Sequence, residues 1–523
     1  MITDARSVPA GAVVDAEICI IGAGAAGITL AREFRASPFR VAVLESGGMR
    51  YDPETQELYD GQSIGQPFSG LMSERLRFFG GTTNHWGGWC VPLDAIDFEK
   101  RADLPNHIGW PFPRSHLDPW YRRAQAVCRL GSYDYRPADW GIPEKEIPPP
   151  FAGPDFACRI LQVSPVHFGP FYARELREAL RITVYLHANA VNLDDGGDAA
   201  AIREVAVETL SGNRFAVRAR VYILATGGIE NARLLLASGR PDGRGLGNDH
   251  DLVGRFFMTH LVYGGGIIVP SNPRMNFDFQ TAGVFSGFGG RHSFVPFISL
   301  SAASMRRRKL PSIWLHWAFQ FAPVGGSVEA LKRLIDGEGP GGSVLTDLSA
   351  VVGHLEGVAD YAVRKALFGE GIPIEALQLH CASEQLPNPS SRITLGATRD
   401  RLGMRETVVD WQPMPQDKAH AVATLRLLGQ EIGQAGFGRL RSPLVEHDAW
   451  PDDFYGNEHH MGTTRMHDDP TQGVVDRNCR MHGVKNLFVA GSSVFPVGGA
   501  NNPTLTIVAL ALRLADHVKT VLA

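Results

Sequence analysis

Near the start of the chain, short and mostly apolar runs alternate with a segment whose apolar residues have the spacing of a helix. The runs at 17–21 (EICII) and 40–44 (RVAVL) are rich in β-branched residues, and the segment 24–36 between them has the spacing of a helix. Runs of this length and composition are typical of buried strands in a parallel sheet. The segment therefore predicts a βαβ unit with a right-handed crossover.

The same alternation returns twice further along the chain. Residues 220–238 (RVYILATGGIENARLLLAS) predict a strand, a glycine turn and a helix, and the last segment repeats that order with a strand at NLFVA and a helix over 504–522. The other elements expected in the first half are a helix at 115–130 with Ser115 as its N-cap, a helix at 171–180, and strands at 182–187, 202–209 and 214–224.

The block 263–440 lacks this alternation. It mixes short β-like runs with helical stretches at 328–336 and 350–368 and an alternating strand at 391–395 (SRITL). We interpret it as an α+β domain with an antiparallel sheet and helices on one side. The expected fold is an α/β, Rossmann-type domain made of residues 14–262 and 441–523, with an inserted substrate domain at 263–440.

Composition and charge narrow the class of protein. The 523 residues suit two or three domains, and a net charge of −4 offers no basic face for nucleic acid. No apolar run reaches the roughly 18–20 residues that span a bilayer, and the first residues lack the pattern of a signal peptide. The six cysteines are scattered without a C-x-x-C pair, which favours a reducing compartment. We expect a cytoplasmic protein; export with a partner that carries the signal stays open.

A glycine fingerprint follows the first predicted strand. It reads Gly22-Ala23-Gly24-Ala25-Ala26-Gly27, and Glu45 ends the next strand. The first glycine permits a tight turn, the second lets the backbone approach a pyrophosphate, and the third lets helix and strand pack closely. The carboxylate about 20 residues on accepts hydrogen bonds from a ribose and repels the 2′-phosphate of NADP. The motif predicts a bound dinucleotide, either FAD or NAD, against the alternative of a purely structural turn.

A second glycine-rich stretch predicts backbone that lies against a large flat ligand. The residues expected there are Gly80, Gly81, Thr82, Asn84, His85, Trp86 and Gly87. The alternative interpretation is a surface turn, in which Trp86 is a core aromatic and His85 a structural histidine.

Two polar constellations near the C-terminus are candidates for catalysis. His459 and His460 open the stretch HHMGTTR, whose spacing does not match a metal-binding H-E-x-x-H motif, so no metal is expected. A neutral histidine suits proton removal from a hydroxyl. Asn502, Pro503 and Thr504 enter the last helix, where the asparagine is either a helix cap or a hydrogen-bond donor to a developing alkoxide.

Together these stretches resemble the glucose–methanol–choline (GMC) oxidoreductases. The similarity is strongest at 17–48, 77–90, 220–238 and 454–517, and it is most specific in HHMGTTRM, GVVD, NLFVAGSSVFP and NNPTLT, which follow in the family's order and spacing. The resemblance implies FAD, the GMC fold, His459 as the active-site histidine and Asn502 as its partner. It further implies cofactor contacts from Ala225, Thr226, Gly227, Val191, Ala490, Gly491, Pro503 and Thr504.

The stretch GGTTNHW is similar to the branch of pyranose oxidases, glycoside 3-oxidases and gluconate or fructose dehydrogenase large subunits. In part of that branch the histidine at the position of His85 is bonded to the flavin, so the resemblance leaves FAD either non-covalent or covalent through His85. The family's threonine two residues later is here Gly87, which weakens the covalent alternative.

The resemblance implies oxidation of a CH–OH group by hydride transfer to the flavin N5 atom, with His459 as base. A sugar or glycoside oxidised at C2 or C3 is the expected substrate, and a natural-product alcohol is the runner-up. Electrons then pass to oxygen or to an acceptor partner; the oligomeric state is left open. A NAD-dependent dehydrogenase, a flavin-containing lyase and a non-catalytic flavin protein are the rival classes.

Overall fold

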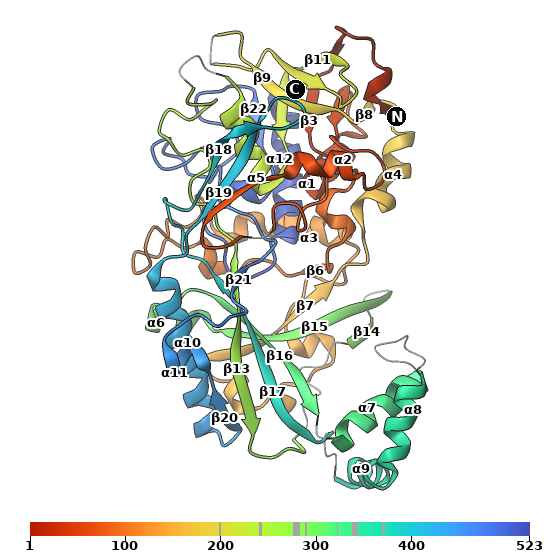
Figure 1. Ribbon diagram of the computed structural model, residues 1–523, viewed down its shortest axis with the longest axis vertical. Helices are drawn as coiled ribbons and strands as arrows, with labels where there is room; N and C mark the ends of the chain where they lie inside the picture. The colour runs from red at the N-terminus through yellow and green to blue at the C-terminus, as the bar shows by residue number, and fades with distance from the viewer. Residues whose placement is uncertain are drawn as a thin grey trace.

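A parallel sheet lies at one end of an elongated molecule, and a large antiparallel sheet lies at the other (Figure 1). The computed structural model describes residues 1–68, 70–197, 200–239, 243–275, 283–287, 290–321, 323–336, 344–368 and 372–523. Within these residues, no helix is both long and apolar enough to cross a membrane.

The βαβ unit at the start of the chain forms the centre of the parallel sheet. β3 (Ile18–Ile21) and β4 (Val41–Leu44) are wholly buried and pair in parallel, and α1 (Ala25–Phe34) connects them. The six-stranded sheet has the order β1-β8-β4-β3-β12-β22. Its remaining strands are β1 (Ile2–Asp4), β8 (Ile182–Leu186), β12 (Val221–Leu224) and β22 (Leu487–Val489). The predicted Rossmann-type arrangement is confirmed.

Helices from distant parts of the chain cover this sheet. α12 (Thr504–Leu522) packs against α1 and α3, and α4 packs against α1. The other helices are α2 (Pro53–Gln56), α3 (Arg114–Val127), α4 (Phe168–Glu178) and α5 (Gly227–Ala237). The prediction of Ser115 as an N-cap is wrong: Pro113 is the last extended residue, with φ −73° and ψ 159°, so the helix begins one residue before Ser115.

Two small sheets flank the parallel sheet. One has the order β2-β11-β10-β9 and the other β18-β19-β5. Their strands are β2 (Val13–Asp15), β9 (Asn189–Asp194), β10 (Glu204–Glu208), β11 (Arg214–Arg218), β5 (Gly61–Gly65), β18 (Arg392–Arg399) and β19 (Arg405–Trp411). Ile393 and Trp411 are buried in the same core as the parallel sheet, although they lie within the block predicted as an insertion.

The antiparallel sheet combines strands from both sides of the predicted domain boundary. Its path is β20-β13-β17-β16-β15-β7-β6, with β14 paired to β15 and β21 paired to β13. The strands are β6 (Trp89–Cys90), β7 (Phe156–Val163), β13 (His260–Pro270), β14 (Gly283–Gly287), β15 (Gly290–Leu300), β16 (Ile313–Phe321), β17 (Ile374–Glu384), β20 (Gly438–Arg441) and β21 (Tyr455–Gly456). The domain boundaries at 263 and 440 stay a prediction.

Several helices accompany the antiparallel sheet. α10 (Pro415–Gln434) buries Leu425, Leu428 and Ile432 in the core of this sheet. The others are α6 (Ala302–Arg308), α7 (Pro323–Asp336), α8 (Val344–Gly353), α9 (Leu355–Phe368) and α11 (Pro443–His447). In Figure 1, α7, α8 and α9 form a lobe at the lower right, away from α10 and α11.

A buried cluster of charges connects α5 to the irregular segment that follows β5. Arg75 Nη1 lies 2.8 Å from Glu230 Oε1, and Arg77 Nη1 lies 3.3 Å from Glu230 Oε2. Arg233 Nη1 lies 3.4 Å from the same Oε2, and Arg233 Nη2 pairs with Asp400. Burial acts to raise the pKa of Glu230, but the three guanidinium groups outweigh it and lower that pKa to about 2.

We expect Glu230→Gln to destabilise the protein, because three guanidinium groups then lose one buried carboxylate. Breaking a buried pair of this kind costs roughly 3–5 kcal/mol. A carboxyl with a lowered pKa stabilises the fold above its unfolded pKa and loses that contribution as the pH falls through its folded pKa. The difference in thermal midpoint between wild type and variant should therefore persist at neutral pH and shrink between roughly pH 4.5 and 2. An equal difference at pH 7 and pH 3 would contradict this assignment.

Candidate active site

A cavity of about 1110 Å³ lies between the two large sheets. Ile21 and Leu44, at the carboxyl ends of β3 and β4, line one end, and Val262 and Trp314 of the antiparallel sheet line another part. Ligands of open α/β sheets bind outside the carboxyl ends of the strands. The cavity therefore lies where the fold is expected to hold a ligand.

The three fingerprint glycines have two kinds of surroundings. Gly22 has φ +103°, and a Cβ added to it would lie 2.5 Å from the Ala225 carbonyl oxygen. A Cβ on Gly27 would lie 1.9 Å from the Gly22 carbonyl oxygen, so helix and turn could not approach as they do. A Cβ on Gly24 would meet nothing within 4 Å, and this residue lines the cavity with Ala25 and Ala26. Gly22 and Gly27 are glycine because the packing leaves no room for a side chain, whereas Gly24 borders space for a ligand.

Glu45 lines the same end of the cavity. Its Oε2 accepts a hydrogen bond of 3.0 Å from the Ala23 amide, and its Oε1 accepts one of 2.9 Å from the Gly47 amide. Burial raises the pKa of Glu45, while these two amides and Arg77 act in the opposite direction. A carboxylate offers about four acceptor positions, so two remain for the hydroxyl pair of a ribose.

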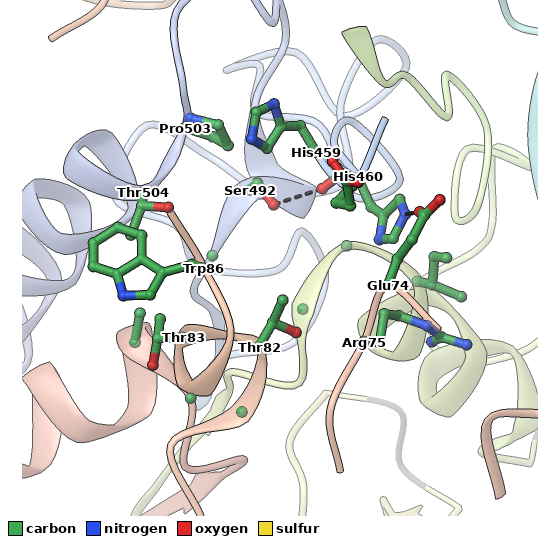
Figure 2. A pocket seen from close by; sticks show the side chains of 18 of the residues that line it. Glu74, Arg75, Thr82, Thr83, Trp86, His459, His460, Ser492, Pro503 and Thr504 are labelled. Atoms are coloured by element: carbon green, nitrogen blue, oxygen red, sulfur yellow. Dashed lines mark hydrogen bonds and ion pairs between the residues drawn. The ribbon is translucent and has the colours of Figure 1, made fainter. Parts of the chain in front are cut away.

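The second glycine-rich stretch contributes a wall of the cavity. Its lining residues are Gly81, Thr82, Thr83, His85, Trp86 and Gly87. Gly80 and Asn84 stand behind that wall: the Asn84 amide donates to the Phe79 and Gly81 carbonyls at 3.0 Å each and holds the turn. Trp86 donates from Nε1 to the Val166 carbonyl at 2.9 Å. Figure 2 shows the Trp86 indole beside Thr504, across the cavity from Glu74 and Arg75.

The turns after β12 and β22 form a third wall. Ala225, Thr226, Gly227 and Gly491 line the cavity. Ala490 does not line it, and its carbonyl accepts a hydrogen bond from Asn231 Nδ2 at 3.0 Å.

The predicted contact at Val191 is not among the cavity-lining residues. Ala188 and Ala190 line the cavity there instead. The contact that the resemblance implies at Val191 is one of the strand backbone, and it stays a prediction.

His459 and Asn502 meet at the cavity, although 43 positions separate them in the chain. Asn502 Nδ2 lies 3.4 Å from His459 Nε2. On the other side of the ring, His459 Nδ1 lies 2.9 Å from Asn457 Nδ2 and 2.9 Å from His260 Nδ1. Burial, followed by His260 and His460, holds the pKa of His459 well below its usual range. The imidazole is therefore neutral at neutral pH.

The start of α12 bears on the capping role considered for Asn502. The N-cap of this helix is Pro503, which makes no side-chain capping bond, and the first helical residue is Thr504. Asn502 is thus not the cap, and its amide contacts the histidine instead. Pro503 and Thr504 both line the cavity.

His460 also lines the cavity, and neighbouring groups hold its ring and backbone in place. Its Nε2 lies 3.2 Å from Glu74 Oε2, and its carbonyl accepts a hydrogen bond of 2.6 Å from the Ser492 hydroxyl (Figure 2). Its ring stacks on Phe257 at 5.9 Å. Among the described residues, no group of three or more His, Cys, Asp or Glu side chains is arranged to hold a metal ion.

The antiparallel sheet supplies an aromatic part of the wall. Trp314 and His316 stack with an interplanar angle of 6°, and the Trp89 ring lies 5.6 Å from that of Trp314. All three line the cavity. Burial, followed by His380, lowers the pKa of His316, so the wall is uncharged here at neutral pH. By contrast, Trp317 is 1% exposed in the core of the sheet.

Sequence reasoning missed His260, Asn457, Trp89, His316 and His380 as residues of the site. His260 and His459 are 199 positions apart, and pairing of β13 with β21 places the segments that carry them close together. The alternation of β16 offered a partial signal, because Trp314 and His316 share one face of the strand. The register that turns this face toward the cavity is a long-range property.

The cavity fits a dinucleotide cofactor. A Cβ on Gly24, Gly227 or Gly491 would meet nothing within 4 Å, so three backbone turns border open space. Unsatisfied amides at the start of α1 favour a phosphate, and the Glu45 carboxylate retains acceptor positions for a ribose. The donor set is thus that of a cofactor with phosphates and a ribose.

Comparisons with known proteins agree with this site. Residues 387–511 match a family described as GMC oxidoreductase. The chain is 24% identical to 6'''-hydroxyparomomycin C oxidase of Streptomyces lividus, over 97% of this chain and 92% of that protein. It is 30% identical to C-glycoside 3-oxidase of Arthrobacter globiformis, over 36% of this chain and 38% of that protein. The fold matches formate oxidase of Aspergillus oryzae with a TM-score of 0.57 and 16% identity, over 98% of this chain and 99% of that one.

The family match covers the segment that carries His459 and Asn502, and the fold likeness extends over nearly the whole chain. The chain is therefore similar to the GMC oxidoreductases, through the family match over residues 387–511 and the likeness in fold, and it is a FAD-dependent oxidoreductase that acts on CH–OH groups.

Proposed function

We propose that this enzyme oxidises a secondary hydroxyl of a sugar or glycoside, at C2 or C3, with His459 as the base and Asn502 as its partner. The observation that carries the proposal is the pair formed by His459 Nε2 and Asn502 Nδ2, 3.4 Å apart on the cavity wall. One group accepts a proton and the other donates a hydrogen bond, and both are needed where a hydroxyl loses its proton.

The residues assigned to FAD divide by the part of the cofactor that they suit. Gly24 and the first amides of α1 suit the pyrophosphate, and Glu45 suits the ribose. Gly81, Thr82 and Trp86 border the part of the cavity that leads to His459. When bound, FAD supplies the hydride acceptor, its N5 atom.

The protein groups handle the proton of the reaction. His459 is neutral at neutral pH because its pKa is lowered, so its imidazole is ready to accept the hydroxyl proton. The Asn502 amide donates to the same substrate oxygen while negative charge grows on it. This arrangement leaves the carbon free to release its hydride.

The uncharged aromatic wall supports a carbohydrate substrate. Trp89, Trp314 and His316 offer flat surfaces, on which the apolar face of a sugar ring packs. The similarity to a C-glycoside 3-oxidase supports the same class. A natural-product alcohol is the second candidate, because the chain is similar over most of its length to 6'''-hydroxyparomomycin C oxidase. Peroxide production set against dye-linked turnover separates an oxidase from a dehydrogenase.

We predict that His459→Ala retains bound FAD but loses flavin reduction by substrate. Loss of a general base slows the reaction by roughly 10²–10⁴-fold. Asn502→Ala should slow it less, because the base remains. Anaerobic stopped-flow absorbance measures both rates. His447→Ala, at an exposed histidine of α11 outside the cavity, is the matched control. Reduction at the wild-type rate in His459→Ala would refute the assignment.

We predict that Trp314→Ala raises KM for sugars roughly tenfold, which corresponds to about 1.4 kcal/mol of lost binding. Steady-state kinetics with a sugar panel measures the change. Phe319→Ala is the control, since this aromatic lies on the same strand but packs on the core of the sheet instead of the cavity. Unchanged KM values for every sugar in Trp314→Ala would remove the stacking role.

His85 is exposed on the cavity wall, where its imidazole is available for a covalent bond to the flavin. If that bond forms, acid-precipitated wild-type protein stays yellow and gains the mass of FAD, whereas His85→Ala releases its colour into the supernatant. Colour that is wholly soluble after precipitation of the wild type rules the bond out.

A further inference from the structure

The inner nitrogen of His459 has two competing neighbours. Asn457 Nδ2 and His260 Nδ1 each lie 2.9 Å from His459 Nδ1. The first neighbour donates and so favours a bare Nδ1, which puts the ring proton on Nε2. The second favours a protonated Nδ1 if it accepts. A neutral imidazole carries one proton. These neighbours therefore influence whether that proton lies on Nδ1, which leaves Nε2 bare to act as a base, or on Nε2.

The orientation of the Asn457 amide follows from its other contacts. Its Oδ1 accepts hydrogen bonds from the Thr259 hydroxyl at 2.9 Å, the His459 amide at 3.1 Å and the His260 amide at 3.2 Å. Three donors fix the oxygen on that side, so the NH₂ group faces His459 Nδ1. Asn457 alone would keep the proton on Nε2 and leave His459 unable to accept one there.

His260 provides the opposite influence. It begins β13, and it is 1% exposed. Burial lowers the pKa of His260 to about 4, so its ring is neutral, while the Glu384 carboxylate and the Gly499 carbonyl act to keep a proton on it. Its Nδ1 is turned to His459, and its Nε2 is buried without a hydrogen-bond partner among the described residues. On the outer side of the His459 ring, the Asn502 amide nitrogen lies 3.4 Å from Nε2, and a donor at that position favours a bare Nε2. A bare Nε2 places the ring proton of His459 on Nδ1, where His260 Nδ1 is the acceptor within reach.

We propose that His260 is a positioning residue that accepts a hydrogen bond from His459 Nδ1 and thereby leaves the lone pair of His459 Nε2 facing the substrate hydroxyl. The proposal rests on the proposed role of His459 as base. The hydroxyl proton moves to Nε2, the O–H bond breaks, and the N–H bond at Nδ1 is kept. His260 then accepts from an imidazolium instead of a neutral ring, which strengthens their hydrogen bond as the substrate oxygen becomes negative.

Two substitutions at His260 separate this role from packing. His260→Leu removes the acceptor, and we expect roughly a 10–100-fold loss of kcat with little change in KM, because a general base in the wrong tautomer loses much of its contribution. His260→Asn places an oxygen at the same bond separation from Cα as Nδ1, so it should restore most of kcat. Both variants are measured as FAD-loaded enzyme by anaerobic flavin reduction.

A second substitution, at Asn457, gives His459 Nδ1 an acceptor from its other neighbour. Asn457→Asp keeps the oxygen that accepts from three donors and replaces the amide nitrogen by an oxygen that accepts from Nδ1. Added to His260→Leu, it should raise kcat again. Equal kcat in wild type and His260→Leu, or equal loss in His260→Leu and His260→Asn without rescue by Asn457→Asp, would overturn the proposal.

Nitrogen-15 NMR of histidine-labelled wild-type holoenzyme tests the tautomer without any change at His260. The His459 signals are identified by their loss in His459→Asn. We expect a protonated Nδ1 and a bare Nε2; a protonated Nε2 overturns the proposal even if His260→Leu does not fold. If His459→Ala itself reduces its flavin normally, the proposed function fails first, so the two failures are distinguishable.

Discussion

The close approach of backbone at Gly22 and Gly27 is the constraint on which the rest of the site depends. It presses the start of α1 against β3 and β12 so tightly that a single methyl group at either position would overlap a carbonyl. Because of this contact, the first amides of α1 and the end of β4 open onto one cavity. The cofactor end of the site is therefore fixed by backbone geometry, and side chains refine it.

The end of the cavity where we propose that catalysis takes place is built by segments that are far apart in the chain. His459 follows β21, Asn502 precedes α12, and His260 begins β13. Asn457 ties the first and last of these together through its amide oxygen. At the cofactor end of the cavity, the buried cluster around Glu230 has a similar role, because its ion pairs hold Arg75 and Arg77 against α5. Both devices hold irregular backbone in place where regular secondary structure is absent.

Local patterns predicted the fold well where the chain is locally determined. The βαβ unit, the glycine turns and the last helix follow from short-range periodicity, and the fingerprint with Glu45 indicated a dinucleotide without knowledge of other segments. The fingerprint alone did not distinguish FAD from NAD; the resemblance of the C-terminal motifs did. His459 and Asn502 were assigned by the same resemblance, and the structure brings them within 3.4 Å.

Features that depend on pairing between distant segments could not be predicted from the sequence. β6 and β7 join the antiparallel sheet from outside the predicted insertion, and no local pattern marks them as its members. His260 carries no signal in its own neighbourhood, because its partner lies 199 positions away. Trp314 and Trp317 lie on the same strand, and the register of β16 turns Trp314 to the cavity and Trp317 to the core.

The pH dependence of anaerobic flavin reduction tests the central claim most directly. A base whose pKa lies below 6.5 is neutral throughout the neutral and alkaline range. The rate constant should therefore be constant from roughly pH 7 to 9 and fall on acidification below the ordinary histidine range. This acidic fall should be missing from the residual rate of His459→Ala. An acidic fall that persists unchanged in the variant would contradict the account.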